Sequence, residues 1–315
     1  MIFSEQYICR VPVTLIMFNR PEQTEHIINA LRAVKPVEVF VISDGPRMFN
    51  KEDVILVEKC RALIDQIDWD CTVFKNFSEK NEGCRRRVNS GLDWVFGITK
   101  ETIIIEDDCL PTVDFFKFME WGLLKYQNNS QIGMISGSNL IDFKFHTSHR
   151  NGFSRYINIW GWATWRRVWI SHDKFLSIND LKKHRYRINK QNCFTFFESL
   201  YWNEIFKNTI NSGSTWDFQL QHSFFRLNYL SVYPNNNLIE NIGFGQNGTH
   251  TKTSTPEYIR KSKPKDDVDI MSATANVIIQ VNNQRDRYLI KTIWYYSSFT
   301  AVRLWWTNLF RYLMI

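Results

Sequence analysis

Three consecutive acidic residues, Glu106, Asp107 and Asp108, follow directly on the β-branched run 102–105. Carboxylates this close together repel one another unless a cation shares their charge. A hard divalent ion, Mg²⁺ or Mn²⁺, suits a ligand set of carboxylate oxygens. Such an ion would bridge to a diphosphate and stabilise the charge on a departing nucleotide. Acid clusters at strand ends also occur in phosphatases and phosphotransfer receivers, so the triplet indicates a metal site without choosing the reaction.

Two further groups of residues could contact a nucleotide. Asp44 ends an apolar run, where a carboxylate can accept hydrogen bonds from a base or ribose, although an Asp before Gly45-Pro46 is also typical of a plain turn. The basic segment 83–87 precedes a helical pattern, and both helix N-termini and Arg clusters favour phosphate. The alternative for this segment is an ordinary solvated basic face.

The elements that must position these residues alternate along the first part of the chain. We interpret the short apolar runs as strands, and they cover residues 11–18, 37–44, 71–77, 102–105 and 132–136. Helical patterns separate them, starting at Pro21 and covering residues 52–67, 85–96 and 114–126. This alternation predicts a largely parallel α/β sheet. Because ligands bind outside the carboxyl ends of such strands, Asp44 and the acidic triplet should lie at one edge.

The later part of the chain has a different character. Residues 137–250 are rich in Trp, Asn, Ser and Gly, which is typical of a loop-rich lobe that shapes a binding site. Residues 251–269 are polar and are interpreted as an exposed connector. The stretch after Phe299 predicts an amphipathic helix that is rich in aromatic side chains. This helix either docks on its own domain or lies in a membrane interface. We therefore divide the chain into residues 1–136, 137–250 and 251–315.

The composition limits the partners and the compartment. Lys and Arg number 39 against 32 Asp and Glu, a net charge of +7 that suits anionic partners such as nucleotide phosphates or anionic lipid. The basic residues are scattered and no nucleic-acid motif is present, so we expect no nucleic-acid partner. The six cysteines form no CxxC pair, and no signal peptide or long apolar segment is evident. We expect a cytoplasmic protein, located at the inner face of the membrane if the C-terminal helix binds lipid.

The order of these motifs resembles that of inverting GT-A glycosyltransferases of the N-acetylglucosaminyltransferase I type and of related bacterial nucleotide-diphospho-sugar transferases. Seven stretches between about residues 11 and 250 carry the resemblance: Phe18-Asn-Arg-Pro, Ile42-Ser-Asp-Gly, the helix 85–96, Ile105-Glu-Asp-Asp, Trp160-Gly-Trp-Ala-Thr-Trp, Trp216-Asp-Phe-Gln and residues 241–250. The resemblance implies a GT-A fold with a Rossmann-like, mostly parallel sheet. Residues 1–136 would bind a nucleotide-diphosphate sugar, and residues 137–250 would hold the acceptor.

The resemblance also implies roles for individual residues. The donor, expected to be a UDP-sugar, would contact Asn19, Arg20, Asp44, Arg86, Arg87, Glu106, Asp107 and Thr249. The metal ligands would be Asp108 and His250, the alternative for His250 being a plain loop histidine. Asp217, beside Trp216 at an apparent helix start, would be the catalytic base, its alternative being a helix cap. A saccharide or lipid-linked saccharide acceptor would lie on Trp160, Gly161, Trp162 and Trp165, unless these are plain core residues.

The implied reaction is one direct displacement at the anomeric carbon, with inversion. A sugar nucleotidyltransferase, the first rival, would share the sheet and the divalent ion. It should have a Gly-rich phosphate loop after the first strand, where this chain has Phe18-Asn-Arg-Pro-Glu-Gln. A non-enzymatic membrane-surface or polysaccharide-binding module, the second rival, would explain the basic charge and the aromatic C-terminus but not the acidic triplet.

Overall fold

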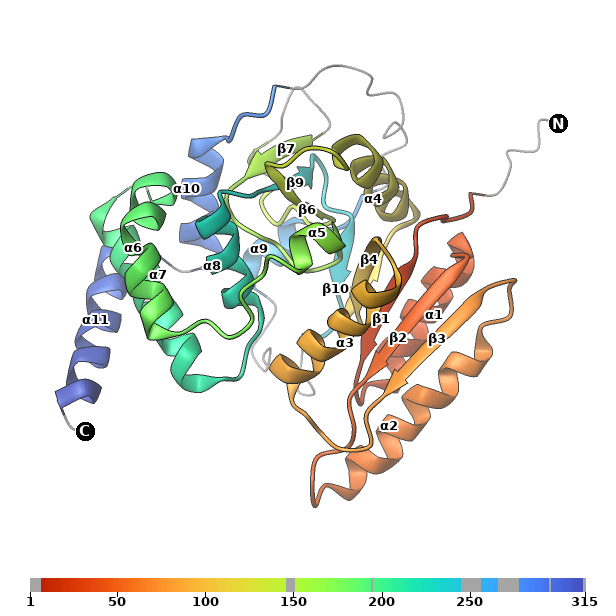
Figure 1. Ribbon diagram of the computed structural model, residues 1–315. Coiled ribbons are helices and arrows are strands. Elements are labelled where there is room, and N and C mark those ends of the chain that lie inside the picture. The colour runs from red at the N-terminus through yellow and green to blue at the C-terminus, as the bar shows by residue number, and fades with distance from the viewer. Residues whose placement is uncertain are drawn as a thin grey trace.

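The computed structural model describes residues 7–145, 151–193, 195–244, 256–265, 278–294 and 296–313. Its centre is an eight-stranded mixed sheet with the strand order β3-β2-β1-β4-β8-β6-β9-β7. Helices surround this sheet, and the later helices of the chain gather on the side away from β3 (Figure 1). The predicted α/β fold is therefore confirmed.

The first half of the sheet is parallel. β1 (Val13–Met17) pairs with β2 (Glu38–Ser43) on one side and with β4 (Glu101–Glu106) on the other, and β3 (Thr72–Phe77) pairs with β2. The strands β1, β2 and β4 are almost continuously apolar, as expected where helices cover both faces of a sheet. β3 lies at the edge and is only partly buried, which explains why its sequence pattern is weaker.

Three helices connect these strands: α1 (Pro21–Val34), α2 (Lys51–Leu63, followed by the short 3₁₀ helix η1, Ile64–Gln66) and α3 (Cys84–Ile98). Pro21 occupies the first turn of α1, where its missing N–H costs nothing. The side chain of Asn50 caps α2. Right-handed crossovers place α1 and α2 on one face of the sheet and α3 on the other. The strand order therefore reverses between β1 and β4, which creates a crevice at their carboxyl ends.

The second half of the sheet is mixed. Its strands are β6 (Ile132–Ser136), β7 (Asn151–Ser154), β8 (Trp162–Trp165) and β9 (Leu230–Pro234). The same part of the chain contains β5 (Cys109–Pro111), α4 (Val113–Tyr126), α5 (Arg166–Trp169) and β10 (Ile239–Asn241). β8 runs antiparallel between β4 and β6 and so joins the two halves. β10 forms a separate antiparallel pair with β5, directly after the acidic triplet.

A second core beside the sheet is formed by α6 (Ile178–Asn192), α7 (Phe196–Ser212), α8 (Asp217–Leu227), α10 (Asn283–Thr292) and α11 (Ser298–Leu313). The sequence patterns predicted α11 and the start of α8 but did not locate α6, α7 or α10. The short helix α9 (Glu257–Lys261) has no buried residue and is not part of this core. The centre of this core is Trp202, whose ring contacts Tyr156, Phe206 and Phe225. The described part of residues 137–250, which was expected to be rich in loops, contains α6, α7 and α8 as well as loops.

The C-terminal segment is attached to the sheet through buried polar contacts. Asp286 on α10 accepts a hydrogen bond from Ser154 Oγ at 2.6 Å and another from the backbone N–H of Arg155 at 3.0 Å. Helix α11 packs on α7, and Ala301 is fully buried there. None of the described helices is long and apolar enough to cross a membrane. All six cysteines are free thiols.

Candidate active site

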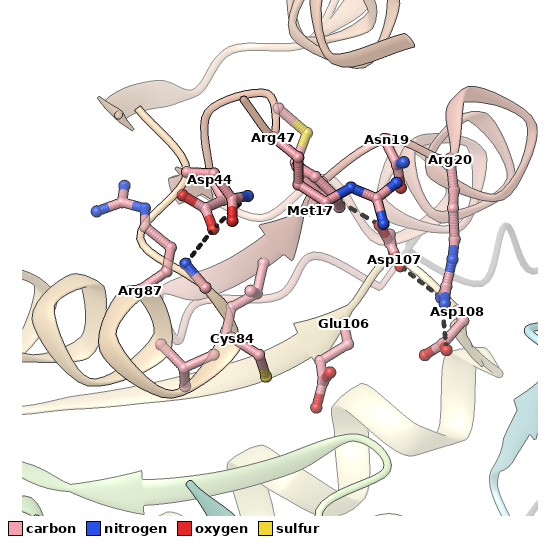
Figure 2. Close-up of a pocket in the computed structure, with 15 residues that line it drawn as sticks. Met17, Asn19, Arg20, Asp44, Arg47, Cys84, Arg87, Glu106, Asp107 and Asp108 are labelled. Atoms are coloured by element: carbon pink, nitrogen blue, oxygen red, sulfur yellow. Dashed lines mark hydrogen bonds and ion pairs between the residues drawn. The ribbon is translucent and has the colours of Figure 1, made fainter. Parts of the chain in front are cut away.

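A cavity of about 290 Å³ opens at the carboxyl ends of β1, β2 and β4 (Figure 2). It coincides with the crevice where the strand order reverses. Its lining comes from the ends of all three strands and the start of α3: Ile16, Met17, Phe18, Asn19, Arg20, Asp44, Arg47, Asn81, Gly83, Cys84, Arg87, Val88, Glu106, Asp107 and Asp108. The structure thus brings together the strand-end residues that the sequence selected at three separate places.

Arg20 lies between the acidic side chains that follow β4. Its Nη1 is 2.8 Å from Asp108 Oδ2 and 3.2 Å from Asp107 Oδ1 (Figure 2). The second oxygen of Asp107 accepts a hydrogen bond from the backbone N–H of Phe18 at 3.1 Å. Acids this close together need a cation to share their charge. In this structure the guanidinium of Arg20 supplies that positive charge.

Asp217 lies near the acidic triplet although it belongs to a different part of the chain. Burial and, in decreasing order, the charges of Asp108, Asp107 and Asp217 together raise the pKa of Glu106 to about 8. Burial likewise raises the pKa of Cys84 to about 12, with contributions from Glu106 and Asp217. Asp217 is not part of the cavity lining, but its charge acts on two residues that are. The acid predicted as a base and the triplet therefore belong to one electrostatic site.

Asp217 begins α8 but does not cap it. The N-cap position is Trp216, which makes no side-chain capping hydrogen bond. The Asp217 carboxylate accepts a hydrogen bond from the Thr215 hydroxyl. The helix-cap alternative for Asp217 is therefore not what the structure shows.

Asp44 has a different task from the one predicted. Its Oδ1 accepts hydrogen bonds from the backbone N–H groups of Gly45 and Glu82, both at 2.9 Å. Its Oδ2 accepts from the backbone N–H of Gly83 at 3.0 Å and from Asn81 Nδ2 at 3.1 Å. Four donors saturate the two oxygens of a carboxylate. The expected contact with a base or ribose is corrected accordingly: Asp44 anchors the loop 81–83, which forms one wall of the cavity.

The arginines at the start of α3 also differ from the prediction. Arg87 is buried, and its Nε donates to the backbone carbonyl of Ser43 at 3.2 Å while Nη2 donates to Asn76 Oδ1 at 2.6 Å. A buried guanidinium needs such partners because an unpaired buried charge is costly. Its guanidinium points away from the acidic triplet (Figure 2). Arg86 is exposed and is not part of the lining. The structure assigns Arg87 to the packing of β2 and β3 rather than to phosphate binding.

A second positively charged residue at the cavity, Arg47, was not predicted from the sequence. Arg47 follows Asp44-Gly45-Pro46, and its Nη2 donates to Asp53 Oδ1 at 2.8 Å. The same Asp53 oxygen accepts a hydrogen bond from Asn19 Nδ2 at 2.8 Å. One buried carboxylate therefore holds both Asn19, which the sequence predicted at the site, and Arg47, which it did not. The guanidinium of Arg47 lies over the ring of Phe18, 5.6 Å from its centroid. The strand-end rule that selected Asp44 could also have selected Arg47.

Asp108 is the candidate metal ligand, and its surroundings suit that role on one condition. The described residues contain no group of three or more His, Cys, Asp or Glu side chains that could hold a metal ion. Ions such as Mg²⁺ are, however, often held by one or two carboxylates together with substrate phosphates. Asp108 is 18% exposed and could serve in that way. The condition is that Arg20 must first release Asp108 Oδ2. Thr249 and His250 lie outside the described residues.

The tryptophans predicted to border an acceptor divide into two groups. Trp162 is 1% exposed and Trp165 is 5% exposed, and both belong to the core around β8. Trp162 stacks on Trp216 with 5.9 Å between ring centroids. An acceptor cannot reach rings that are packed on all sides, so the prediction for these two residues is corrected. Trp160 is only partly buried and lines a second cavity.

Gly161 has the positive φ of 60° that favours glycine, and it closely approaches its neighbours. A Cβ at this position would lie 2.5 Å from Ile239 Cδ1 and 2.9 Å from Phe115 Cε2. Gly161, predicted to contact an acceptor, therefore makes its close approach to the protein's own core. The contact holds β8 against β10.

No protein-family model matches this sequence, and no curated protein matches it. Solved structures with a similar arrangement include the mannosyltransferase PcManGT from Pyrobaculum calidifontis in complex with GDP-Man and Mn²⁺, with 14% identity over 70% of both chains and a TM-score of 0.37. A UDP-glucose pyrophosphorylase in its apo form has 8% identity over 71% of this chain and 90% of its own, with a TM-score of 0.35. The 4-diphosphocytidyl-2C-methyl-D-erythritol synthase from Anaerococcus prevotii has 9% identity, covering 56% and 84%, with a TM-score of 0.34. Because these scores and identities are low, the function must be argued from the geometry of the cavity.

Proposed function

We propose that this protein is a glycosyltransferase that moves a sugar from a nucleotide-diphosphate sugar, a UDP-sugar in the first instance, to a hydroxyl of a saccharide or glycolipid acceptor. The observation that carries the proposal is the cavity at the reversal of strand order, where Arg20, Asp107 and Asp108 meet. Such crevices in α/β sheets are where ligands bind. A further acid, Asp217, comes from the other half of the molecule, and its charge acts on Glu106. It is the acid that we propose as the catalytic base.

The proposed reaction is a single displacement with inversion. The acceptor oxygen forms a bond to the anomeric carbon, the bond from that carbon to the diphosphate oxygen breaks, and Asp217 takes the acceptor proton. Arg20 leaves Asp108 and donates to the diphosphate, where a guanidinium binds phosphate oxygens well. A bound Mn²⁺ or Mg²⁺ would neutralise charge on the leaving diphosphate. Asp108 is the described residue that would hold the ion.

The nucleotidyltransferase alternative is less consistent with the structure. β1 ends at Met17 and α1 already begins at Pro21, so the intervening segment has no room for a Gly-rich phosphate loop. The two reactions also differ in their products. A glycosyltransferase releases a nucleoside diphosphate, whereas a nucleotidyltransferase joins a nucleoside triphosphate to a sugar phosphate and releases pyrophosphate.

The proposal is tested by screening nucleotides and nucleotide sugars for Mn²⁺-dependent thermal stabilisation, since a ligand that binds the folded state raises its apparent stability. A stabilising donor is then incubated with candidate acceptors, and NMR of the product reports whether the anomeric configuration is inverted. Asp108→Ala should abolish the Mn²⁺-dependent part of nucleotide binding and leave the protein folded. Binding of donor and Mn²⁺ by this variant at the level of the parent would contradict the assignment.

We also propose that α11 contacts a membrane surface. Phe299 is 75% exposed and Trp306 is 48% exposed, while Arg303 is exposed on the same helix. Aromatic and basic side chains together suit the headgroup region of an anionic bilayer. This contact would bring the enzyme to a lipid-linked acceptor.

A further inference from the structure

A second cavity of about 220 Å³ lies next to the proposed donor site. It is bounded by β10, by the segment 242–244 that follows it, and by α9 with residues 262–264. The alternative for such a hollow is an unused surface depression. Its aromatic, polar and charged lining argues for a ligand.

The aromatic part of the lining consists of Trp160 and Phe244. Their ring centroids are 6.0 Å apart and their planes are inclined at 75°, so they form two walls of a corner. Trp160 is only partly buried, in contrast to the core residues Trp162 and Trp165. An accessible indole face offers an apolar platform to the C–H face of a sugar ring, while its N–H can still donate a hydrogen bond.

The polar part of the lining includes an unsatisfied hydroxyl. Ser262 is 2% exposed, and its Oγ has no hydrogen-bond partner among the described residues. Leaving a buried hydroxyl unpaired is costly, so a polar partner is expected there. The surrounding backbone is held in place, because Asn237 Nδ2 donates to the carbonyls of Ile239 at 2.8 Å and Ser262 at 2.6 Å. The wall is therefore preformed, with one polar group awaiting a partner.

The charged part of the lining is predominantly basic. Arg260 and Lys263 both line the cavity, and neither forms an ion pair within the part of the chain that the structure describes. Lys261, between them in sequence, is instead paired with Glu257 at 2.7 Å and does not line the cavity. Glu240 is the one acidic residue of the lining. Two positive charges facing one negative charge favour a ligand that carries an anionic group.

Only one strand of backbone separates this cavity from Asp108. The backbone N–H of Ile242 donates to the Asp108 carbonyl at 2.8 Å. A Cβ on Gly243 would lie 2.4 Å from Asp108 Oδ2. Asn241, Ile242 and Phe244 line the second cavity. A ligand in this cavity is thus adjacent to the carboxylate that would hold the donor diphosphate.

We propose that the second cavity is the acceptor subsite and that it takes a saccharide carrying an anionic group, a carboxylate or a phosphate. This inference rests on the proposed transferase function and specifies its acceptor class. Trp160 and Phe244 hold the sugar ring, Ser262 Oγ bonds to a sugar hydroxyl, and Arg260 and Lys263 bind the anionic group.

The test is direct binding, measured by ligand-observed NMR titration with glucose, glucuronic acid and glucose 6-phosphate, each with and without UDP and Mn²⁺. Both anionic sugars are expected to bind at least about tenfold more tightly than glucose, since hydrogen bonds to charged groups are the strong ones. A preference for glucuronic acid or for glucose 6-phosphate identifies the anionic group as carboxylate or phosphate. Arg260→Gln combined with Lys263→Gln should remove the advantage over glucose. Lys261→Gln removes one positive charge from the same segment outside the cavity and should leave the affinities unchanged.

Two results would overturn the inference. Equal binding of glucose and both anionic sugars would show that the cavity has no anionic preference, and an effect of Lys261→Gln equal to that of the double variant would show that only general surface charge matters. Trp160→Leu should weaken all three sugars, which a purely electrostatic attraction would not. Donor binding is measured separately with nucleotide sugars. Failure of that measurement alone would refute the transferase proposal, whereas failure of the sugar titrations alone would refute only the acceptor class.

Discussion

Arg20 balances the negative charge at the end of β4, because its guanidinium reaches both Asp107 and Asp108. The position that it occupies beside Asp108 Oδ2 is one that a divalent ion would also need. Two cations that compete for one carboxylate weaken each other's binding. We therefore expect the donor diphosphate, which attracts Arg20, to promote binding of the ion.

This competition predicts the behaviour of Arg20→Gln. Without nucleotide, the variant should bind Mn²⁺ roughly tenfold more tightly, since a positive charge close to the ion's site has been removed. Its affinity for a UDP-sugar should fall, because a phosphate contact is lost. Isothermal titration calorimetry measures both affinities. Arg32→Gln, which breaks the exposed ion pair with Asp68, is the matched control. Weaker Mn²⁺ binding by Arg20→Gln would contradict the competition.

The variant Asp217→Asn distinguishes a transferase from a protein that only binds a sugar nucleotide. Asn keeps the shape of the side chain but cannot take a proton, so turnover should fall about 10²–10⁴-fold while donor affinity stays close to that of the parent. Steady-state kinetics and donor titration check the two halves of this expectation. If turnover remains near the parental value, Asp217 is not the base. Glu240, which lines the second cavity, is then the next residue to substitute.

The loop 81–83 shows how one element depends on a single side chain. Asp44 holds it by three hydrogen bonds, and Gly45 packs against Lys80, where a Cβ would lie 2.6 Å from the backbone carbon. The loop immediately precedes α3 and contributes Asn81 and Gly83 to the cavity. Its position therefore decides the shape of the donor site.

Asp44→Asn replaces one acceptor oxygen with an amide that cannot accept the hydrogen bonds of Gly83 and Asn81. The free energy of unfolding should fall by about 0.5–1.5 kcal/mol for each lost hydrogen bond, the net contribution of a typical hydrogen bond, since these donors are only partly buried. Hydrogen–deuterium exchange should accelerate at the amides of Glu82 and Gly83. Asp70→Asn, at an exposed position before β3, serves as the control. Unchanged exchange in the loop would show that Asp44 does not anchor it.

Helix α11 has a buried and an exposed side that can be tested separately. Phe299→Ser combined with Trp306→Ser removes exposed aromatic rings, so binding to anionic vesicles should drop while the melting temperature changes little. Ala301→Asp instead places a charge in the second core and should destabilise the protein. Vesicle sedimentation and thermal denaturation give the two measurements. Vesicle binding that persists in the double serine variant would refute the membrane contact.

At the scale of the whole molecule, the stability of the second core should depend on pH. His172 and His222 are both buried, and burial, helped by the nearby positive charge of Arg226, lowers the pKa of each from 6.5 to about 3. In the unfolded chain each imidazole takes up a proton as the pH falls through about 6.5, whereas in the folded protein it stays neutral. Stability is therefore complete above pH 6.5 and is lost progressively as the pH falls towards 3.

Each of the two histidines should contribute roughly 1.4 kcal/mol of lost stability per pH unit in this range. Urea denaturation at pH 7.0, 6.0 and 5.0 measures the slope. His222→Leu removes one titrating group from an apolar position in which neither ring nitrogen has a hydrogen-bond partner among the described residues. The slope of this variant should be smaller than that of the parent by about 1.4 kcal/mol per pH unit, the contribution of one histidine. Equal slopes would show that His222 titrates normally in the folded protein.

Local patterns in the sequence were sufficient for the first half of the fold and for part of the site. Strands such as β1, β2 and β4 are continuous apolar runs, and α1 and α3 have one apolar face, so neighbouring residues alone reveal them. The position of Glu106, Asp107 and Asp108 at the end of β4 follows from the same local reading. Helix α7 was missed because it is buried on several sides by other helices and so lacks a clear apolar stripe.

Only the tertiary structure decided what these residues contact. Asp44 and the loop 81–83 are separated by more than thirty residues, and no local pattern reveals that backbone N–H groups saturate its carboxylate. Arg20 reaches Asp108 because β1 and β4 are neighbours in the sheet, and Asp217 approaches Glu106 because α8 packs from the other half of the molecule. The sequence alone determined which residue types stand at the strand ends. Which of them remain available to a ligand depends on long-range packing, because hydrogen bonds and ion pairs form between whichever groups the fold brings together.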